Sequence, residues 1–176
     1  MSVLVNYGCG TSAPVDWINF DASPRLRIER LPGIGSAMRA SGNRLFPPNV
    51  RYGDIVKGLP VGRSTADAVF SSHALEHIHR SDMPAALANT LKIMKSGAPF
   101  RMVIPDIGWR AAQYQKAIMN GETDAADMFL RSCMLGEANR PVGIMGRARA
   151  MFGNSQHRWM YDYARMEKLL TDAGFT

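Results

Sequence analysis

Turns that could hold a ligand follow short apolar runs at four places in the sequence. They are the glycine turn Gly8-Cys9-Gly10, then Asp21, then Asp54, and then Ser71-Ser72-His73. Glycine lets a backbone come close to a ligand, and a carboxylate can accept hydrogen bonds from both hydroxyls of a ribose. A second carboxylate can accept from the amino group of adenine. In this order the four turns describe a pocket for an adenosine.

Apolar runs of strand length predict how these turns are placed. They cover residues 3–7, 17–21, 50–52, 68–72 and 100–104. Runs of this kind, alternating with helical patterns, favour an α/β fold with a mostly parallel sheet and flanking helices. Ligands of such open sheets bind outside the carboxyl ends of the strands, where strand order reverses. If the first and fourth runs are neighbours at that point, the glycine turn and His73 flank one crevice.

Helical patterns fill much of the second half of the chain. Leu87, Leu91 and Met94 recur on one helical face, with Ser81 or Asp82 as the expected cap. Further helices are expected at residues 109–119, at 125–134, and from about 162 to 173 before Gly174.

The glycine turn does not fit a dinucleotide site. Dinucleotides are held by a Gly-x-Gly-x-x-Gly turn that opens a helix. Here six residues, 11–16, separate Gly10 from the next strand, and they contain no third glycine. They are too few for a crossover helix, whereas a ligand without phosphates, such as S-adenosylmethionine, needs none.

Composition bounds the class of protein. The chain has 176 residues, a net charge of +6, 46% hydrophobic residues and two cysteines, which predicts a single globular domain over residues 1–176. No apolar run approaches the roughly 20 residues of a membrane span, and the first residues do not resemble a signal peptide. Cys9 and Cys133 cannot form a disulfide framework or a four-cysteine zinc site, so a cytoplasmic location is expected.

Charge and methionine are concentrated in particular segments. Arginines crowd residues 25–51 and 131–158, which indicates either solvated loops or a surface for an anionic acceptor. They are not interleaved with stacking aromatics, so nucleic acid is not favoured. A Met/Arg-rich insertion at about 110–156 is interpreted either as a small satellite core or as a lid over a substrate.

Several segments resemble the class I S-adenosylmethionine-dependent methyltransferases, in the branch with the type 11 domain. The first two are residues 4–11 and 17–21. The most specific is 66–78, with Leu-Glu-His at 75–77, followed by 91–97 and 100–106. Residues 157–162, which read His-Arg-Trp-Met-Tyr-Asp, and 169–175 are similar to the family's last helix. The resemblance implies a Rossmann-like methyltransferase fold and S-adenosyl-L-methionine as the cofactor.

The resemblance also implies roles for individual residues. It places the cofactor against Gly8, Cys9 and Gly10, its ribose on Asp21, its adenine on Asp54 and the Ile55 backbone, and its methionine part along Ser71 and Ser72.

The sequence also departs from the family. Asn6 and Ser12 replace an acid and a glycine, and the first crossover helix is nearly absent. The family's last two strands are expected to be lacking, either because the sequence is truncated or because the sheet ends early. Their absence leaves residues 100–104 as an open sheet edge. Such an edge predicts a homodimer, cover by the Met-rich segment 119–160, or aggregation.

A general base near neutral pH assists transfer to a hydroxyl, which suits histidine. His73 is the first candidate, with a capping or packing role as the equal alternative, and Asp106 is the second. Glu76 and His77 are interpreted as structural, while His157 and Tyr161 could reach in from the last segment. No cluster shows metal-ligand spacing, so no metal is predicted.

Together the residues and the resemblance predict a methyltransferase acting by direct in-line transfer to oxygen of a small or glycan-type acceptor. The glycan assignment rests on the resemblance to enzymes of surface-polysaccharide synthesis. The alternative is a non-catalytic binding module of the same fold that acts through a partner.

Overall fold

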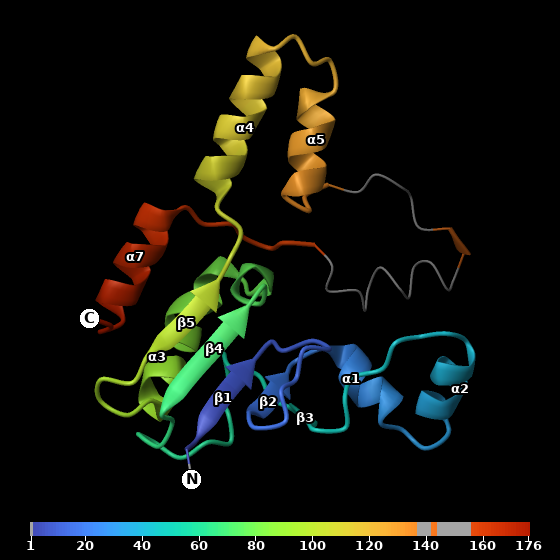
Figure 1. Ribbon diagram of the computed structural model, residues 1–176, viewed down its shortest axis with the longest axis vertical. Coiled ribbons are helices and arrows are strands. Elements are labelled where there is room, and N and C mark those ends of the chain that lie inside the picture. Colours follow the sequence, from blue (N-terminus) through green and yellow to red (C-terminus); the bar gives the residue numbers. More distant parts are fainter. Residues whose placement is uncertain (1, 137–141, 144–155) are drawn as a thin grey trace.

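A parallel sheet of five strands forms the centre of the molecule (Figure 1). The computed structural model describes residues 2–136, 142–143 and 156–176. The strands are β1 (Leu4–Tyr7), β2 (Ile18–Asp21), β3 (Val50–Tyr52), β4 (Ala68–Ser72) and β5 (Phe100–Val103). Their order is β3-β2-β1-β4-β5, so strand order reverses between β1 and β4. The predicted strands and the mostly parallel sheet are confirmed.

Two helices cover one face of the sheet. They are α3 (Met83–Ile93) and α7 (Tyr163–Asp172), both within the expected ranges. Leu87 of α3 and Met166 of α7 pack into one core with Val5 and Tyr7 of β1. The single-turn helices η1 (Leu75–His77) and η2 (Arg80–Asp82) connect β4 to α3. This core holds β1 and β4 side by side, and with them the turns at their carboxyl ends.

A loop replaces the first crossover helix, as predicted. Asn6 and Asn19 lie buried on the opposite face of the sheet and hold this loop. The Asn19 amide donates to the carbonyls of Pro14 and Trp17, each at 2.8 Å, and its oxygen accepts from Asn6 at 3.0 Å. The side-chain amides therefore take the place of a helix in fixing the path from β1 to β2.

The arginine-rich segment after β2 forms two short helices that the sequence analysis did not predict, α1 (Pro24–Glu29) and α2 (Ile34–Ala40). Its arginines serve the segment itself. Arg30 donates to the carbonyls of Pro47 and Val50, and Arg25 donates to that of Arg44. These bonds satisfy loop carbonyls, so part of this arginine content is structural.

The predicted Met/Arg-rich insertion begins with a helical hairpin that projects away from the sheet (Figure 1). It consists of α4 (Ile107–Met119) and α5 (Ala125–Ser132), joined by packing of Tyr114 on Phe129. Residues 137–141 and 144–155 of the insertion lie outside the described residues, so its interpretation as a satellite core or as a lid stays a prediction.

Beyond β5 the described part of the chain supplies no sixth strand. One isolated parallel bridge, between Asp106 and Tyr161, lies just past the end of β5. Tyr161, directly after the Met-rich segment, thus pairs beyond the carboxyl end of this edge, while no strand within the described residues pairs with the rest. None of the described helices is both long and apolar enough to cross a membrane.

Candidate active site

The turns after β1, β2 and β3 meet at the carboxyl edge of the sheet, and the turn after β4 joins them. A Cβ added at Gly8 would stand only 2.1 Å from that of Ala74, so the turns after β1 and β4 touch. The Gly53 amide donates to the Asp21 carbonyl at 3.1 Å, which ties the turn after β3 to the end of β2. The sequence-predicted residues therefore do come together along one edge.

Asp21 is the centre of this arrangement and is only 8% exposed. One carboxylate oxygen accepts from the Gly10 amide and the other from the Ser23 amide, both at 2.8 Å. Each oxygen has a second lone pair for a ligand hydroxyl. Asp21 is thus positioned for a ribose, but it also holds the glycine turn in shape.

The Cys9 side chain faces away from the edge, into a small buried cluster with Leu26 and Val50. Burial, reinforced by the nearby Asp21 carboxylate, raises the pKa of the Cys9 thiol to about 12. The thiol is therefore protonated and unreactive at neutral pH. Only the Cys9 backbone is left to contact a cofactor.

The predicted adenine residues, Asp54 and Ile55, are held by contacts within their own turn and by α3. One Asp54 oxygen accepts from the Val56 amide at 3.0 Å, and the other lies 3.7 Å from the Lys57 ammonium. Ile55 is buried in the core, and its carbonyl accepts from Asn89 of α3 at 2.9 Å. α3 therefore positions this turn from beneath the sheet.

Ser71 and Ser72 separate onto the two faces of β4. Ser71 is 1% exposed and in register with Tyr7, whose hydroxyl accepts from Thr90 of α3. The Ser71 side chain therefore lies under the sheet, while the partly exposed Ser72 lies on the other face. Of the two serines, only Ser72 presents its side chain away from the helical core.

His73 directly follows β4 and has a left-handed backbone, with φ of +50°. Its amide still donates to the Val103 carbonyl at 2.9 Å, while its imidazole is 63% exposed. The imidazole Nδ1 lies 3.3 Å from Oε1 of Glu76, a carboxylate that is 1% exposed. A histidine at the crevice, backed by a buried carboxylate, can take up a proton.

Asp106 has a structural use that the sequence analysis did not consider. It is the N-cap of α4, and its Oδ1 accepts from the amides of Gly108 at 2.7 Å and Trp109 at 3.2 Å. A proton taken up by this carboxylate would remove its charge and weaken the cap.

The structure adds residues to the site that the sequence analysis ranked low. His157 lies beside Glu76 and His77, its Nε2 3.8 Å from Glu76 Oε1. Burial lowers the pKa of His157. The only sequence signal for this meeting is the pair of motifs at 75–77 and 157–162, separated by about eighty residues.

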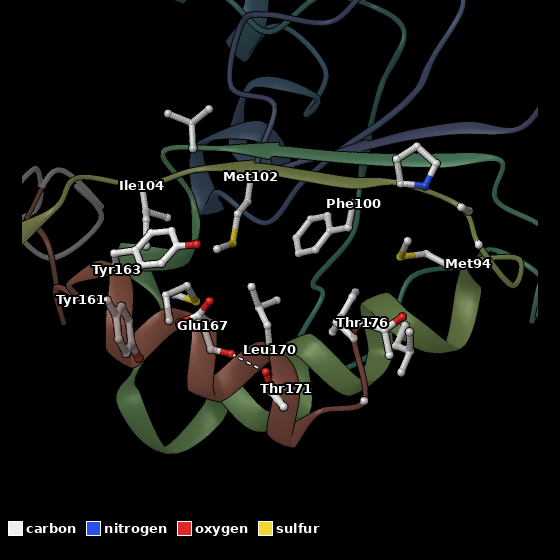
Figure 2. Close-up of a pocket in the computed structure, with 18 of the residues that line it drawn as sticks. Met94, Phe100, Met102, Ile104, Tyr161, Tyr163, Glu167, Leu170, Thr171 and Thr176 are labelled. Atoms are coloured by element: carbon white, nitrogen blue, oxygen red, sulfur yellow. Dashed lines mark hydrogen bonds between the residues drawn. The ribbon is translucent and has the colours of Figure 1, made fainter.

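An open groove of about 1150 Å³ runs along β5, away from the cofactor edge. Figure 2 shows Phe100 and Met102 of β5 facing Leu170 of α7 across it. Its lining is mostly apolar, with Asp106 and Tyr161 at one end. The groove belongs to the sheet edge, whereas the adenosine-binding candidates lie at the strand ends.

An open parallel sheet with a glycine turn after β1, an acid after β2 and strand reversal at β1 and β4 defines a nucleoside-binding α/β domain of the Rossmann-like class. Residues 5–102, more than half of the chain, match the family described as methyltransferase domain, type 11. The chain belongs to this family. Among curated proteins, no sequence matches it significantly.

Solved structures of S-adenosylmethionine-dependent methyltransferases share the fold. The chain superposes on one from Methanosarcina mazei with a TM-score of 0.55 and 12% identity, covering 97% of this chain and 77% of that one. For one from Thermotoga maritima the TM-score is 0.53 and the identity 16%, covering 100% of this chain and 65% of that one. A phosphoethanolamine N-methyltransferase from Haemonchus contortus, in complex with S-adenosyl-L-methionine, gives a TM-score of 0.50 and 11% identity, covering 99% of this chain and 34% of that one. The chain thus spans about two thirds of one relative's length and one third of another's.

The residues present fit S-adenosyl-L-methionine, the family's cofactor. Gly10 has a φ of +52° and open space where a side chain would stand, so its backbone is accessible to a ligand. Beside it, Asp21 keeps lone pairs for ribose hydroxyls, and Asp54 lies at the adjoining strand end. The helix that binds the pyrophosphate in dinucleotide sites is absent here, because residues 8–17 form a loop.

Proposed function

We propose that the chain is the cofactor-binding and catalytic part of a methyltransferase that methylates a hydroxyl of a small or glycan-type acceptor. The observation that carries this proposal is the pairing of His73 with buried Glu76, 3.3 Å apart, beside the glycine turn. The fold supports the cofactor, and this pair supports transfer to oxygen.

His73 is the better of the two predicted bases. Its imidazole is exposed at the strand end, and Glu76 behind it stabilises the positive charge that the ring gains with a proton. The Asp106 carboxylate instead caps the first turn of α4. We therefore assign the proton transfer to His73 and the capping of α4 to Asp106.

The reaction follows from this arrangement. S-adenosyl-L-methionine, when bound, supplies an electrophilic methyl group, and its sulfur keeps the electron pair of the broken S–C bond. His73 Nε2 accepts the acceptor's hydroxyl proton as the oxygen forms its bond to the methyl carbon. Gly8, Gly10 and Asp21 would hold the cofactor in a fixed position from which its methyl group can be transferred to that oxygen.

The glycan class of acceptor and the cytoplasmic location belong to the same proposal. The first rests on the His-x-x-Glu-His and His-Arg-Trp-Met-Tyr-Asp motifs. The second is supported by Cys9 and Cys133, both free and buried thiols.

Methyl transfer is the test, because cofactor binding alone does not separate an enzyme from a binding module. The chain is incubated with cofactor labelled in its methyl group and with a panel of mono- and oligosaccharides, nucleotide sugars and small amines. Label in an alkali-stable ether of a sugar supports the proposal. Label only in amines, or cofactor binding without any transfer, contradicts it.

A further inference from the structure

The buried carboxylate of Glu76 is the least satisfied group near the site. Glu76 is 1% exposed, and among the described residues neither of its oxygens accepts a hydrogen bond of normal geometry. The nearest groups that can carry a positive charge, both at Oε1, are His73 Nδ1 at 3.3 Å and His157 Nε2 at 3.8 Å. A buried charge without hydrogen-bond partners is costly unless a cation or a proton neutralises it. The chain nevertheless brings two more ligand groups to this point.

His77 and His157 complete the cluster. One ligand atom from each of Glu76, His77 and His157 can be chosen so that all lie within 4.8 Å of one another. The two rings meet edge to face with centroids 5.1 Å apart. The backbone locks this meeting, because the amides of Arg158 and Trp159 both donate to the Glu76 carbonyl. In Figure 1 the segment that carries them leads across the carboxyl end of the sheet into α7.

The histidines are prepared to act as ligands. His77 Nδ1 lies 3.0 Å from the Gln156 carbonyl, a contact that requires hydrogen on Nδ1 and leaves the lone pair on Nε2. Metal-binding histidines are commonly oriented through such a bond. His157 is buried, and its Nε2 lies 3.8 Å from Glu76 Oε1.

We propose that Glu76, His77 and His157 bind one divalent transition-metal ion beside the methyl-transfer site. Two imidazoles and one carboxylate suit Zn²⁺ and its first-row neighbours, and three protein ligands leave positions open for a substrate. This departs from the expectation of no metal, which considered spacing along the sequence rather than the meeting of distant segments.

The ion's role in transfer, unlike its binding, rests on the function proposed above. Coordinated to the ion, the acceptor hydroxyl becomes more acidic. It then loses its proton to His73, its oxygen forms the bond to the methyl carbon, and the S–C electron pair remains on sulfur. The ion itself is neither oxidised nor reduced.

Calorimetric titration of the metal-free chain with Zn²⁺, Co²⁺ and Mn²⁺ tests the site. We expect one equivalent of ion to bind, and affinity to fall at least about tenfold in His157→Ala and in Glu76→Gln. His79→Ala is the control, since His79 is exposed, follows η1 by two residues and gives no ligand atom to the cluster. Its ring contacts the Arg158 side chain rather than His157, so its metal affinity should equal that of the wild type.

Thermal unfolding keeps the test decisive if one variant folds poorly. The ion should raise the melting temperature of the wild type and of His79→Ala, but not that of His77→Ala, whose ring is only partly buried. No binding by the wild type, or equal loss in His79→Ala and His157→Ala, would overturn the site. S-adenosyl-L-methionine is titrated separately: metal binding without cofactor binding defeats the proposed function alone, and the reverse defeats this inference alone.

Discussion

His73 adopts a backbone conformation that few non-glycine residues occupy, with φ of +50°. This unfavourable conformation directs the imidazole past the end of β4 and toward Glu76. Strain of this kind is frequent at functional sites. A packing role would need burial, whereas this imidazole is largely exposed.

Replacing His73 should separate catalysis from stability. Asn tolerates the left-handed conformation, so His73→Asn should lower turnover by about 10²-fold or more with cofactor affinity and melting temperature nearly unchanged. Turnover is measured with labelled cofactor and affinity by calorimetry. Parallel losses of stability and activity would instead favour the packing role, and wild-type turnover would return attention to Asp106.

Asp21 should affect both binding and folding, because its carboxylate accepts from two backbone amides. Asp21→Ala removes charge-assisted hydrogen bonds worth about 1.5–3 kcal/mol. We expect cofactor affinity to fall about tenfold and the unfolding free energy to fall as well. Asp16→Ala, in an exposed part of the preceding loop, is the control. Unchanged cofactor affinity in Asp21→Ala would remove the ribose assignment.

At the scale of elements, the site depends on turns and loops that are held by side chains rather than by helices. The glycine turn contacts Ala74, and the loop from β1 to β2 is fixed by Asn6 and Asn19. A helix in this position would satisfy its own backbone carbonyls, whereas the carbonyls of this loop accept hydrogen bonds from the side-chain amides of Asn6 and Asn19.

The glycine turn should be far more sensitive at Gly8 than at Gly10. Both have positive φ, but a Cβ at Gly8 would meet Ala74 at 2.1 Å, whereas at Gly10 it would meet nothing within 4 Å. Gly10→Ala should cost about 1–2 kcal/mol of unfolding free energy, and Gly8→Ala about 2–4 kcal/mol because of the added overpacking. Denaturant unfolding measures both, and equal costs would contradict the close contact.

The first loop should loosen when Asn19 is removed. Asn19→Ala removes the acceptor of the buried Asn6 amide and two bonds of 2.8 Å to the carbonyls of Pro14 and Trp17, which should cost about 2–4 kcal/mol. Asn49→Ala removes weaker bonds to the same loop, at 3.1 and 3.3 Å, and should cost about 1 kcal/mol. The ranking, read from denaturant midpoints, matters more than either value. A neutral Asn19→Ala would show that the loop holds itself.

On the scale of the whole molecule, stability is unevenly distributed. The sheet, α3 and α7 share one core, whereas α4 and α5 each bury a single alanine, Ala117 and Ala125. The β5 edge is intermediate in stability. One of its faces packs against the core, while its outer backbone has no strand partner within the described residues.

Association through the β5 edge stays a prediction that sedimentation can test. We expect the sedimentation coefficient to rise with concentration as a second chain pairs along this edge. The β5 amides should then exchange slowly, and those of the α4–α5 hairpin quickly. A monomer at every concentration, with fast-exchanging β5 amides, would show that the edge is stable without a partner.

The sequence by itself determined the five strands, the parallel α/β class, the loop in place of the first crossover helix, and the series of turns that meets at one edge. These follow from local apolar runs, from chain lengths too short for a helix, and from motifs contained in single segments. The short helices α1 and α2 were not predicted, because their apolar faces are small and an arginine-rich segment resembles a solvated loop. Only the tertiary structure decided that Ser71 and Cys9 turn away from the crevice and that Asp106 caps a helix. Only folding, likewise, could bring His157 beside Glu76 and His77, because no local periodicity records a contact between segments about eighty residues apart.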